Sequence, residues 1–315
     1  MKGRIRMKIL IFGRGAIGTQ YAWAFEKAGH DVEFYVRKGR RDQYGPYVDL
    51  KISDARQKKI VEEKWPVRLT EEISSSKKYD LVFLSINPDQ VKEAAKVISP
   101  VIGDATLLFF NNFGKDPFKA TYPVPEDQIV VGFPGAGGGF EGSKLYGNMF
   151  KQVQIGIRDN APKAREKAVI ELFRSAGFKP ALKKDIRSFL INHYAANAAM
   201  EAEVLKHGSF ENVAKNSDAL ADMIRNIREM VPYLKALNVH LDMMTRVLSV
   251  LPPTAVGKLL RKTLYAPGTM AYEALAHNHY KAGYSVKEIV KEATSSGMRL
   301  QRMESALRAS GTEII

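Results

Sequence analysis

A short apolar run that breaks into glycines near the start of the chain restricts its fold more than any other feature. Residues 8–18 read KILIFGRGAIG, with glycines at Gly13, Gly15 and Gly18. In a dinucleotide-binding turn, the first glycine permits a tight strand-to-helix turn, the second lets the backbone approach a pyrophosphate, and the third lets the helix pack closely on the strand. The phosphates lie on the free N–H groups at the positive end of that helix. The spacing therefore predicts a nucleotide-binding turn.

The residues on either side of the glycines support this interpretation. Residues 8–12 are apolar, as in a strand buried on both faces, and apolar residues then repeat at helical spacing until Gly29. Residues 32–36 read as a second strand, which completes a βαβ unit. Ala16 and Ile17, between the second and third glycines, are included in the predicted cofactor site. The alternative is a βαβ unit whose glycines only allow close packing.

The end of the second strand bears on the choice of cofactor. NAD-dependent enzymes usually place an Asp or Glu here to accept hydrogen bonds from the ribose. This chain instead has Arg37, Lys38, Gly39, Arg40 and Arg41. Clustered cations suit a ribose 2′-phosphate, for which Arg offers a planar fork. NADP is therefore the expected cofactor, with Arg37 and Lys38 among its ligands. A solvated basic loop is the alternative, and Asp42 is a weak candidate for a ribose ligand.

Composition excludes several other functions. The 315 residues carry a formal net charge of +14, but Lys and Arg are interspersed with Asp and Glu and no nucleic-acid motif is found. We therefore expect no nucleic-acid partner, and the positive charge suits an anionic cofactor and substrate. The chain has no cysteine, which excludes disulfides, thiolate catalysis and cysteine-bound metals, and no metal site is expected.

No part of the sequence resembles a targeting or membrane segment. The apolar core after the basic N-terminus is about five residues long and is followed by Arg14, well short of a signal peptide. No apolar run approaches the length of a membrane span. We therefore expect a cytoplasmic protein with no membrane partner.

Two kinds of pattern divide the chain. Residues 79–86, 106–111, 128–133 and 152–157 read as further strands that alternate with helical stretches, whereas long helical segments follow from about residue 185. The predicted fold class is α/β: a Rossmann-type doubly wound sheet in residues 1–182, then an all-helical domain in residues 183–315. The glycine-rich residues 135–142 read as a loop, either a second phosphate cradle or a mobile connection.

Several of these motifs together resemble the ketopantoate reductase family. They are the glycine turn, the arginine after the second strand, Asn111 at the end of an apolar strand, and DIRSFLINHYAANAAM over residues 185–200. The resemblance covers roughly two-thirds of the chain. It implies a Rossmann domain joined to a helical domain, with the active site in the cleft between them, and the NADPH-dependent reduction of ketopantoate to pantoate.

The resemblance also implies roles for individual residues. Asn111 matches an asparagine that contacts cofactor and substrate, and Asn197 matches a substrate-binding asparagine. The chain departs from the family where His193 replaces the catalytic lysine and where Asn87 replaces a lysine near the nicotinamide. Asn87 would keep a hydrogen bond to the cofactor or serve only as a turn residue.

The C-terminal signature of the family, a Ser followed by a Glu and an Asn, is approached only by Glu273 with Asn278. The identity of the small anionic carbonyl substrate is therefore open.

The predicted chemistry centres on one helix. Reduction of a ketone needs a group that protonates or stabilises the developing alkoxide, and His193, with an ordinary pKa of about 6.5, suits that role. Asn197 and Glu201 follow at four-residue steps on the same face. The sequence favours a reductase of a small 2-keto acid with His193 as a catalytic residue, and the family resemblance implies Asn197 and Glu273 as the others. The same helix stripe could instead line a polar interface between domains.

Two further alternatives stay open at this stage. Loss of both family lysines also suits an NADP-binding sensor or regulatory protein without catalysis. The apolar stripe Met223, Ile224, Ile227, Met230 and Leu234 offers a surface for a homodimer through the helical domain, or it forms internal core.

Overall fold

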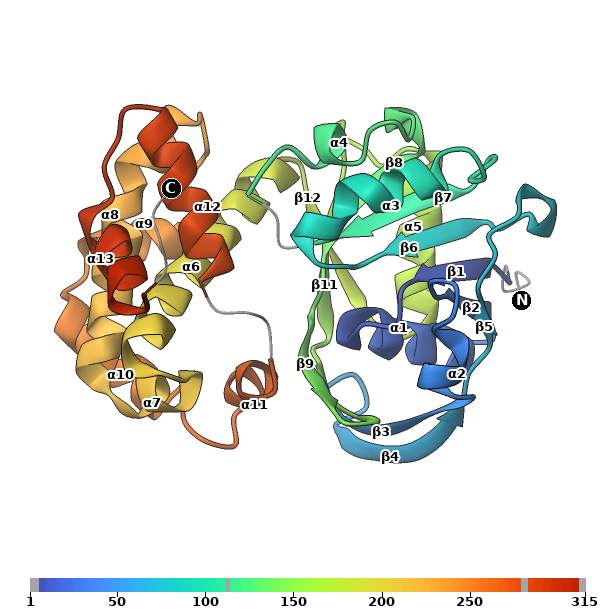
Figure 1. Ribbon diagram of the computed structural model, residues 1–315, viewed down its shortest axis with the longest axis horizontal. Helices are drawn as coiled ribbons and strands as arrows, with labels where there is room; N and C mark the ends of the chain where they lie inside the picture. Colours follow the sequence, from blue (N-terminus) through green and yellow to red (C-terminus); the bar gives the residue numbers. More distant parts are fainter. Residues whose placement is uncertain (1–5, 112–113, 279–282, 312–315) are drawn as a thin grey trace. The chain divides into compact units, whose positions relative to one another are not determined.

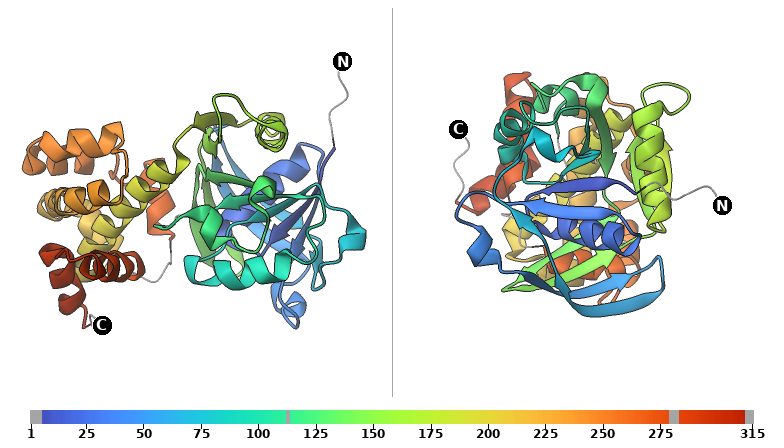
Figure 2. Two further views of the ribbon diagram at one scale, coloured as in Figure 1. Left: turned by 90° about the horizontal axis from the view of Figure 1, so that it is seen from above. Right: turned by 90° about the vertical axis from the view of Figure 1, so that its right-hand side faces the viewer.

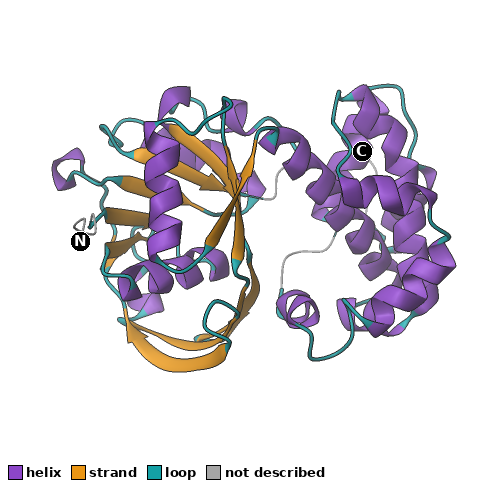
Figure 3. Ribbon diagram, turned by 180° about the vertical axis from the view of Figure 1, so that it is seen from behind, coloured by secondary structure: helices purple, strands orange, loops and turns teal. Residues whose placement is uncertain are grey.

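A computed structural model describes residues 6–111, 114–278 and 283–311 of the chain (Figure 1). The chain forms two compact units. The first comprises residues 1–111 and 115–186, and the second comprises residues 112–114 and 187–315. In the described residues, strands occur only in the first unit and the second is built of helices (Figure 3). The predicted fold class, an α/β sheet domain followed by a helical region, is confirmed.

The main sheet of the first unit has eight strands in the order β12-β11-β8-β7-β6-β1-β2-β5. All its neighbouring strands are parallel except the antiparallel pair β8 and β11. Its strands are β1 (Lys8–Phe12), β2 (Asp31–Tyr35), β5 (Leu69–Thr70), β6 (Leu81–Leu84), β7 (Thr106–Phe110), β8 (Ile129–Phe133), β11 (Gln152–Gly156) and β12 (Lys179–Lys183). The helices of this unit are α1 (Ala16–Lys27), α2 (Arg41–Tyr44), α3 (Val91–Ile98), α4 (Pro117–Ala120) and α5 (Ala164–Ser175).

A second sheet of four strands was not expected from the sequence. Its order is β4-β3-β10-β9, from β3 (Tyr47–Asp54), β4 (Lys59–Pro66), β9 (Ala136–Glu141) and β10 (Lys144–Met149). The interpretation of residues 135–142 as a loop is wrong, because most of them form β9. The glycines allow close strand packing: a β-carbon on Gly138, which has φ +118°, would lie 2.0 Å from the carbonyl oxygen of Tyr146.

Helix α1 lies between the two sheets and forms much of the core (Figures 1 and 2). The fully buried Tyr21 ring makes edge-on contacts with Phe83, Phe110 and Phe173, and its hydroxyl accepts a hydrogen bond from the Gly135 amide. On the opposite side, Gln20 donates to the Gly137 carbonyl in β9. Contacts on both sides set the position of α1, and with it the glycine turn at its start.

The second unit is a helical domain with its own core. It contains α6 (Ile186–His207), of which only the first residue belongs to the first unit, then α7 (Phe210–Lys215), α8 (Ser217–Ala236), α9 (Met243–Val250), α10 (Pro253–Lys262), α11 (Met270–Ala276), α12 (Tyr284–Ser295) and α13 (Gln301–Ala309). The apolar stripe of α8 is at most 4% exposed, from Met223 to Leu234. Of the two alternatives that the sequence left open for this stripe, a dimer surface or internal core, the structure shows internal core.

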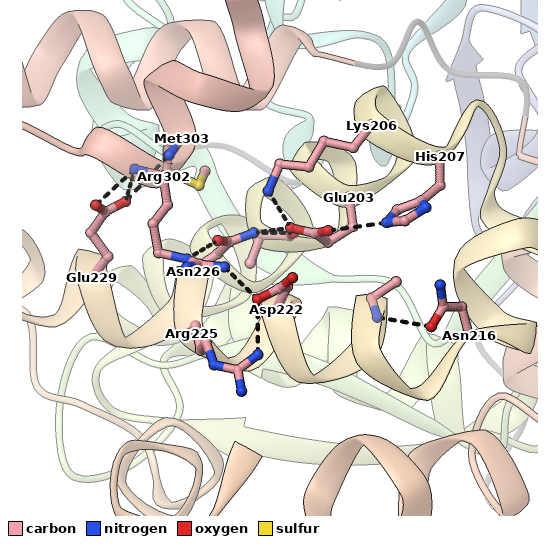
Figure 4. A network of polar contacts seen from close by, with 12 residues as sticks. Glu203, Lys206, His207, Asn216, Asp222, Arg225, Asn226, Glu229, Arg302 and Met303 are labelled. Atoms are coloured by element: carbon pink, nitrogen blue, oxygen red, sulfur yellow. Dashed lines mark hydrogen bonds and ion pairs between the residues drawn. The ribbon is translucent and has the colours of Figure 1, made fainter. Parts of the chain in front are cut away.

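A buried polar network joins three helices of this domain (Figure 4). Glu203 on α6 is fully buried and accepts hydrogen bonds from Lys206 and from Asn226 on α8, at 2.9 and 2.8 Å. Asn226 in turn accepts from the Arg302 guanidinium of α13, which also pairs with Asp222. Because the Asn226 side chain is hydrogen-bonded on both sides, the network aligns these helices.

Candidate functional site

The glycine turn lies at the carboxyl end of β1, where an open parallel sheet places its ligands. Gly13 has φ +87°, a left-handed conformation that favours glycine, and its amide donates to the Tyr35 carbonyl at the end of β2. Helix α1 then begins at Ala16, with Gly15 as its N-cap. No side chain caps the amides of Ala16 and Ile17, and the first turn has no acidic residue. These amides are placed to bind an anion.

The fold constrains the three glycines to different extents. Gly13 is required by its φ, and Gly18 by packing, because a β-carbon there would lie 3.0 Å from Ile11 Cγ2. Gly15 has neither restriction: its φ is −77°, and the nearest atom to an added β-carbon is the Ser85 carbonyl oxygen at 3.8 Å. The fold of the chain itself therefore tolerates a side chain at Gly15. A close approach by the pyrophosphate of a dinucleotide explains the glycine, so the turn fits that cofactor.

The cations after β2 are available for an anionic ligand. Arg37 and Lys38 are exposed, and neither side chain has a hydrogen bond or ion pair with another residue in the described part of the chain. Charges elsewhere on β2 are paired, Glu33 with Lys77 and Asp31 with Arg68. Unlike these paired charges on β2, Arg37 and Lys38 have no carboxylate partner in the described residues, which is consistent with phosphate binding.

The two asparagines of the first unit follow neighbouring strands. Asn111 comes directly after β7, is 7% exposed, and donates from Nδ2 to the Ile86 carbonyl at 2.8 Å. Asn87 follows β6, is exposed, and does not cap the short 3-10 turn that it precedes. Because β1, β6 and β7 are adjacent and parallel, the structure brings the glycine turn, Asn87 and Asn111 to the same edge of the sheet.

On α6, the predicted polar stripe separates into residues with different surroundings. The Asn197 side chain is half-buried and has no hydrogen-bond partner among the described residues. Glu201, four residues later, accepts hydrogen bonds from the Gly283 and Ser285 amides and from the Ser285 hydroxyl. It therefore caps the start of α12. Glu201 lies on the same helix as Asn197, at the predicted four-residue spacing, but its carboxylate is already occupied by these contacts within the fold.

His193 does not have the pKa expected from the sequence. Its ring is half-buried and stacks on Phe189 with the ring centres 6.2 Å apart. Burial lowers the pKa of His193 to about 4, and the nearby Asp242 carboxylate offsets only part of this effect. The imidazole is therefore neutral at pH 7. A neutral ring can donate a hydrogen bond to an alkoxide but does not bring a positive charge.

The low pKa of His193 has a consequence for stability. The pKa lies below its ordinary value of 6.5, so the unfolded chain takes up a proton that the folded chain excludes between about pH 6.5 and 4. The contribution of neutral His193 to stability is complete above pH 6.5 and is lost as the pH falls toward 4. We expect His193→Gln to narrow the difference in urea midpoint between pH 7 and pH 4.5. An unchanged difference in urea midpoint would contradict the low pKa of His193.

Glu273 lies on α11 and has a local role. Its carboxylate accepts a hydrogen bond from the Gly268 amide at 3.2 Å and lies 3.8 Å from His277 on the next turn. Asn278 is exposed just after this helix. These contacts need no ligand, so a catalytic role for Glu273 stays a prediction based on the resemblance.

The sequence interpretation also missed one residue of the turn. Arg14, between the first two glycines, is only 7% exposed and donates to the backbone carbonyls of Tyr44, at the end of α2, and Tyr47, at the start of β3. An arginine at that position of a glycine motif was the available signal.

Among the described residues no cluster of His, Asp or Glu could hold a metal ion, and no helix combines the length and apolarity needed to cross a membrane.

The sequence of the first unit matches a known family. Residues 9–159 match the family model for ketopantoate reductase PanE/ApbA, and this range includes the glycine turn, the cations after β2 and both asparagines. Residues 9–159 form a domain of the ketopantoate reductase family. The resemblance inferred from the motifs is confirmed. Together with the curated relatives, this match makes the chain a nicotinamide-dependent oxidoreductase that acts on C=O and CH–OH groups.

Relatives and solved structures extend the similarity beyond this domain. The chain is 24% identical over 271 residues to 2-dehydropantoate 2-reductase of Lactococcus lactis, covering 80% of this chain and 82% of that protein. A PanE/ApbA family ketopantoate reductase from Ralstonia eutropha has a similar fold, with TM-score 0.74 and 16% identity over 97% of each chain. So has D-mandelate dehydrogenase in a ternary structure with NADH and anilino(oxo)acetate, with TM-score 0.73, 17% identity and 97% of each chain covered.

Proposed function

We propose that this protein reduces a small 2-keto acid, or a related anionic carbonyl compound, with NADPH. The observation that carries the proposal is Gly15, a glycine that neither its φ nor close packing in the fold requires and that a dinucleotide pyrophosphate would explain by its close approach. Gly13, Gly15, Ala16, Ile17 and Gly18 would hold that pyrophosphate.

Preference for NADPH over NADH rests on the unpaired cations after β2. A 2′-phosphate would give Arg37 and Lys38 the anionic partner that they lack in the described residues. Asn87 and Asn111, at the same edge of the sheet, are proposed to bind the remainder of the cofactor. D-mandelate dehydrogenase, of similar fold, was crystallised with NADH, so the choice between the cofactors depends on the local residues rather than on the fold.

We expect Arg37→Gln to weaken NADPH binding about tenfold and to leave NADH binding nearly unchanged, because only NADPH carries the 2′-phosphate. Calorimetric titration of each cofactor measures this. Arg174→Gln is the matched control, since Arg174 is an exposed arginine of α5 paired with Glu171. Equal losses for NADPH and NADH would contradict the assignment of Arg37.

The proposed chemistry assigns the substrate to residues of α6. A bound nicotinamide would supply a hydride to the carbonyl carbon, and water would supply the proton that the carbonyl oxygen takes up. The Asn197 amide, which has no partner in the described residues, can donate a hydrogen bond to that oxygen as it becomes negative. His193 is neutral at pH 7 and is proposed to donate a second hydrogen bond in place of the lysine of the family. Glu273 is also proposed as a residue of the substrate site.

The substrate is proposed from the relatives. The Lactococcus lactis relative is a 2-dehydropantoate 2-reductase, and the D-mandelate dehydrogenase structure contains anilino(oxo)acetate, a small carboxylate with an adjacent carbonyl group. The test is the oxidation of NADPH, followed at 340 nm, with ketopantoate, 2-ketoisovalerate, pyruvate and benzoylformate. Turnover with one of these above background supports the proposal. Tight NADPH binding with no turnover would favour the alternative, an NADP-binding sensor.

A homodimer through the helical domain is also proposed, on a surface other than the buried stripe of α8. The exposed apolar side chains of α9 include Met243, Met244, Val247 and Val250. Light scattering of the protein, with Met244→Lys as the variant, measures whether this surface joins two copies.

A further inference from the structure

Arg14 makes an unusual set of contacts for a residue of a glycine turn. Its guanidinium donates from Nη1 to the Tyr44 carbonyl at 2.5 Å and from Nη2 to the Tyr47 carbonyl at 2.9 Å. The central carbon of the guanidinium also lies 5.0 Å from the centre of the Tyr44 ring. The planar fork of arginine makes two such bonds possible from one side chain.

The charge of Arg14 is buried without a carboxylate. In the described residues Arg14 forms no ion pair, and its Nε is buried with no hydrogen-bond partner. Burial lowers the pKa of Arg14, although an arginine stays charged. A buried unpaired charge is costly, so stability of the free protein does not explain this residue.

The two carbonyls bound by Arg14 lie just beyond the cationic segment. Tyr44 is the last residue of α2, and Tyr47 is the first residue of β3. Before the cationic segment, the Gly13 amide donates a hydrogen bond to the Tyr35 carbonyl. Two consecutive residues of the glycine turn, Gly13 and Arg14, therefore hold both ends of residues 35–47. Arg37 and Lys38 lie within that stretch, and their side chains form no hydrogen bond or ion pair in the described residues.

We propose that Arg14 is a positioning residue for cofactor selection. By holding the Tyr44 and Tyr47 carbonyls, it keeps the cationic segment beside the glycine turn, so that one ligand contacts the turn through its pyrophosphate and the cations through a 2′-phosphate. This inference rests on the proposed preference for NADPH. Arg14 itself is too buried to contact the 2′-phosphate, and its effect is transmitted through the backbone of residues 44–47.

The test compares two small probes that differ by the 2′-phosphate, adenosine 2′,5′-bisphosphate and adenosine 5′-monophosphate. Calorimetry gives the ratio of their dissociation constants for the wild type and for Arg14→Met and Arg14→Lys. Arg68→Met is the matched control, because Arg68 is an exposed arginine of the same unit that also donates to a backbone carbonyl, that of Val32. Amide hydrogen exchange over residues 35–47 provides a second readout, and thermal melts identify any variant that is unfolded at the assay temperature.

We expect both Arg14 variants to lower the preference for the 2′-phosphate about tenfold and to speed exchange over residues 35–47, whereas Arg68→Met changes neither. Arg14→Lys keeps the charge but cannot form the fork, so a wild-type preference in this variant would overturn the positioning role. An unchanged preference in both variants would also overturn it. A wild-type protein with no preference between the probes would instead refute the proposed use of NADPH, and the inference with it.

Discussion

Gly15→Val is expected to lower the affinity for NADPH on the order of 100-fold while the protein stays folded. The φ of −77° suits a β-branched residue, and an added β-carbon makes only ordinary contact with the chain. The valine side chain would instead occupy the space that the pyrophosphate needs above the start of α1. Calorimetric titration with NADPH measures the loss, and a thermal melt shows whether the fold is retained.

Gly18→Val is the control, because it should lower the stability of the fold, whereas Gly15→Val should lower only the affinity for NADPH. Its β-carbon would lie 3.0 Å from Ile11 Cγ2, so overpacking between α1 and β1 should cost about 1–3 kcal/mol of stability. The melting temperature should therefore fall in Gly18→Val and not in Gly15→Val. If Gly15→Val binds NADPH like the wild type, the turn does not hold a pyrophosphate and the proposed function is wrong.

Asn197→Ala is expected to lower kcat by about 10²–10³, the loss seen when one donor to a developing oxyanion is removed. In the described residues the Asn197 side chain has no other partner, so its removal should leave stability nearly unchanged. The measurement is kcat and KM with the best keto acid from the assay, together with a urea unfolding curve.

Asn216→Ala provides the matched control for Asn197. Its side chain accepts hydrogen bonds from the Asp218 and Ala219 amides and caps α8, so the variant should lose about 1 kcal/mol of stability and keep its kcat. A variant at Asn197 that loses stability and keeps kcat would assign Asn197 to the fold rather than to the reaction.

The first βαβ unit was predictable because its signals are local. Strand, turn, helix and second strand follow one another within about thirty residues, and each glycine acts on its own turn. The second sheet was missed for the opposite reason. Strand β3 pairs in parallel with β10, with Asp49 opposite Lys144, and no local pattern links segments so far apart in sequence. The glycines of β9 looked like a loop because glycine is uncommon inside strands, and the close contact of Gly138 with the Tyr146 carbonyl arises only once β9 pairs with β10.

Some features of the candidate site were likewise predictable from the sequence, and others were not. The glycine turn, the cations after β2 and the asparagines at strand ends could all be placed from the sequence, because position on a parallel sheet follows from strand order. The helical spacing of His193, Asn197 and Glu201 was also correct. It did not reveal that Glu201 caps α12 or that burial lowers the pKa of His193, since both effects come from residues on other elements or from the surrounding packing.

The sequence by itself determined the dinucleotide turn, the family of the first unit and the positions of the candidate residues, because backbone conformation and strand order depend on neighbouring residues. Only the tertiary structure decided which polar groups are occupied. It showed Glu201 and Arg14 bound to distant backbone, and Arg37, Lys38 and Asn197 without partners in the described residues. Availability for a ligand depends on solvation and on contacts across the fold, and these arise only when distant segments pack together.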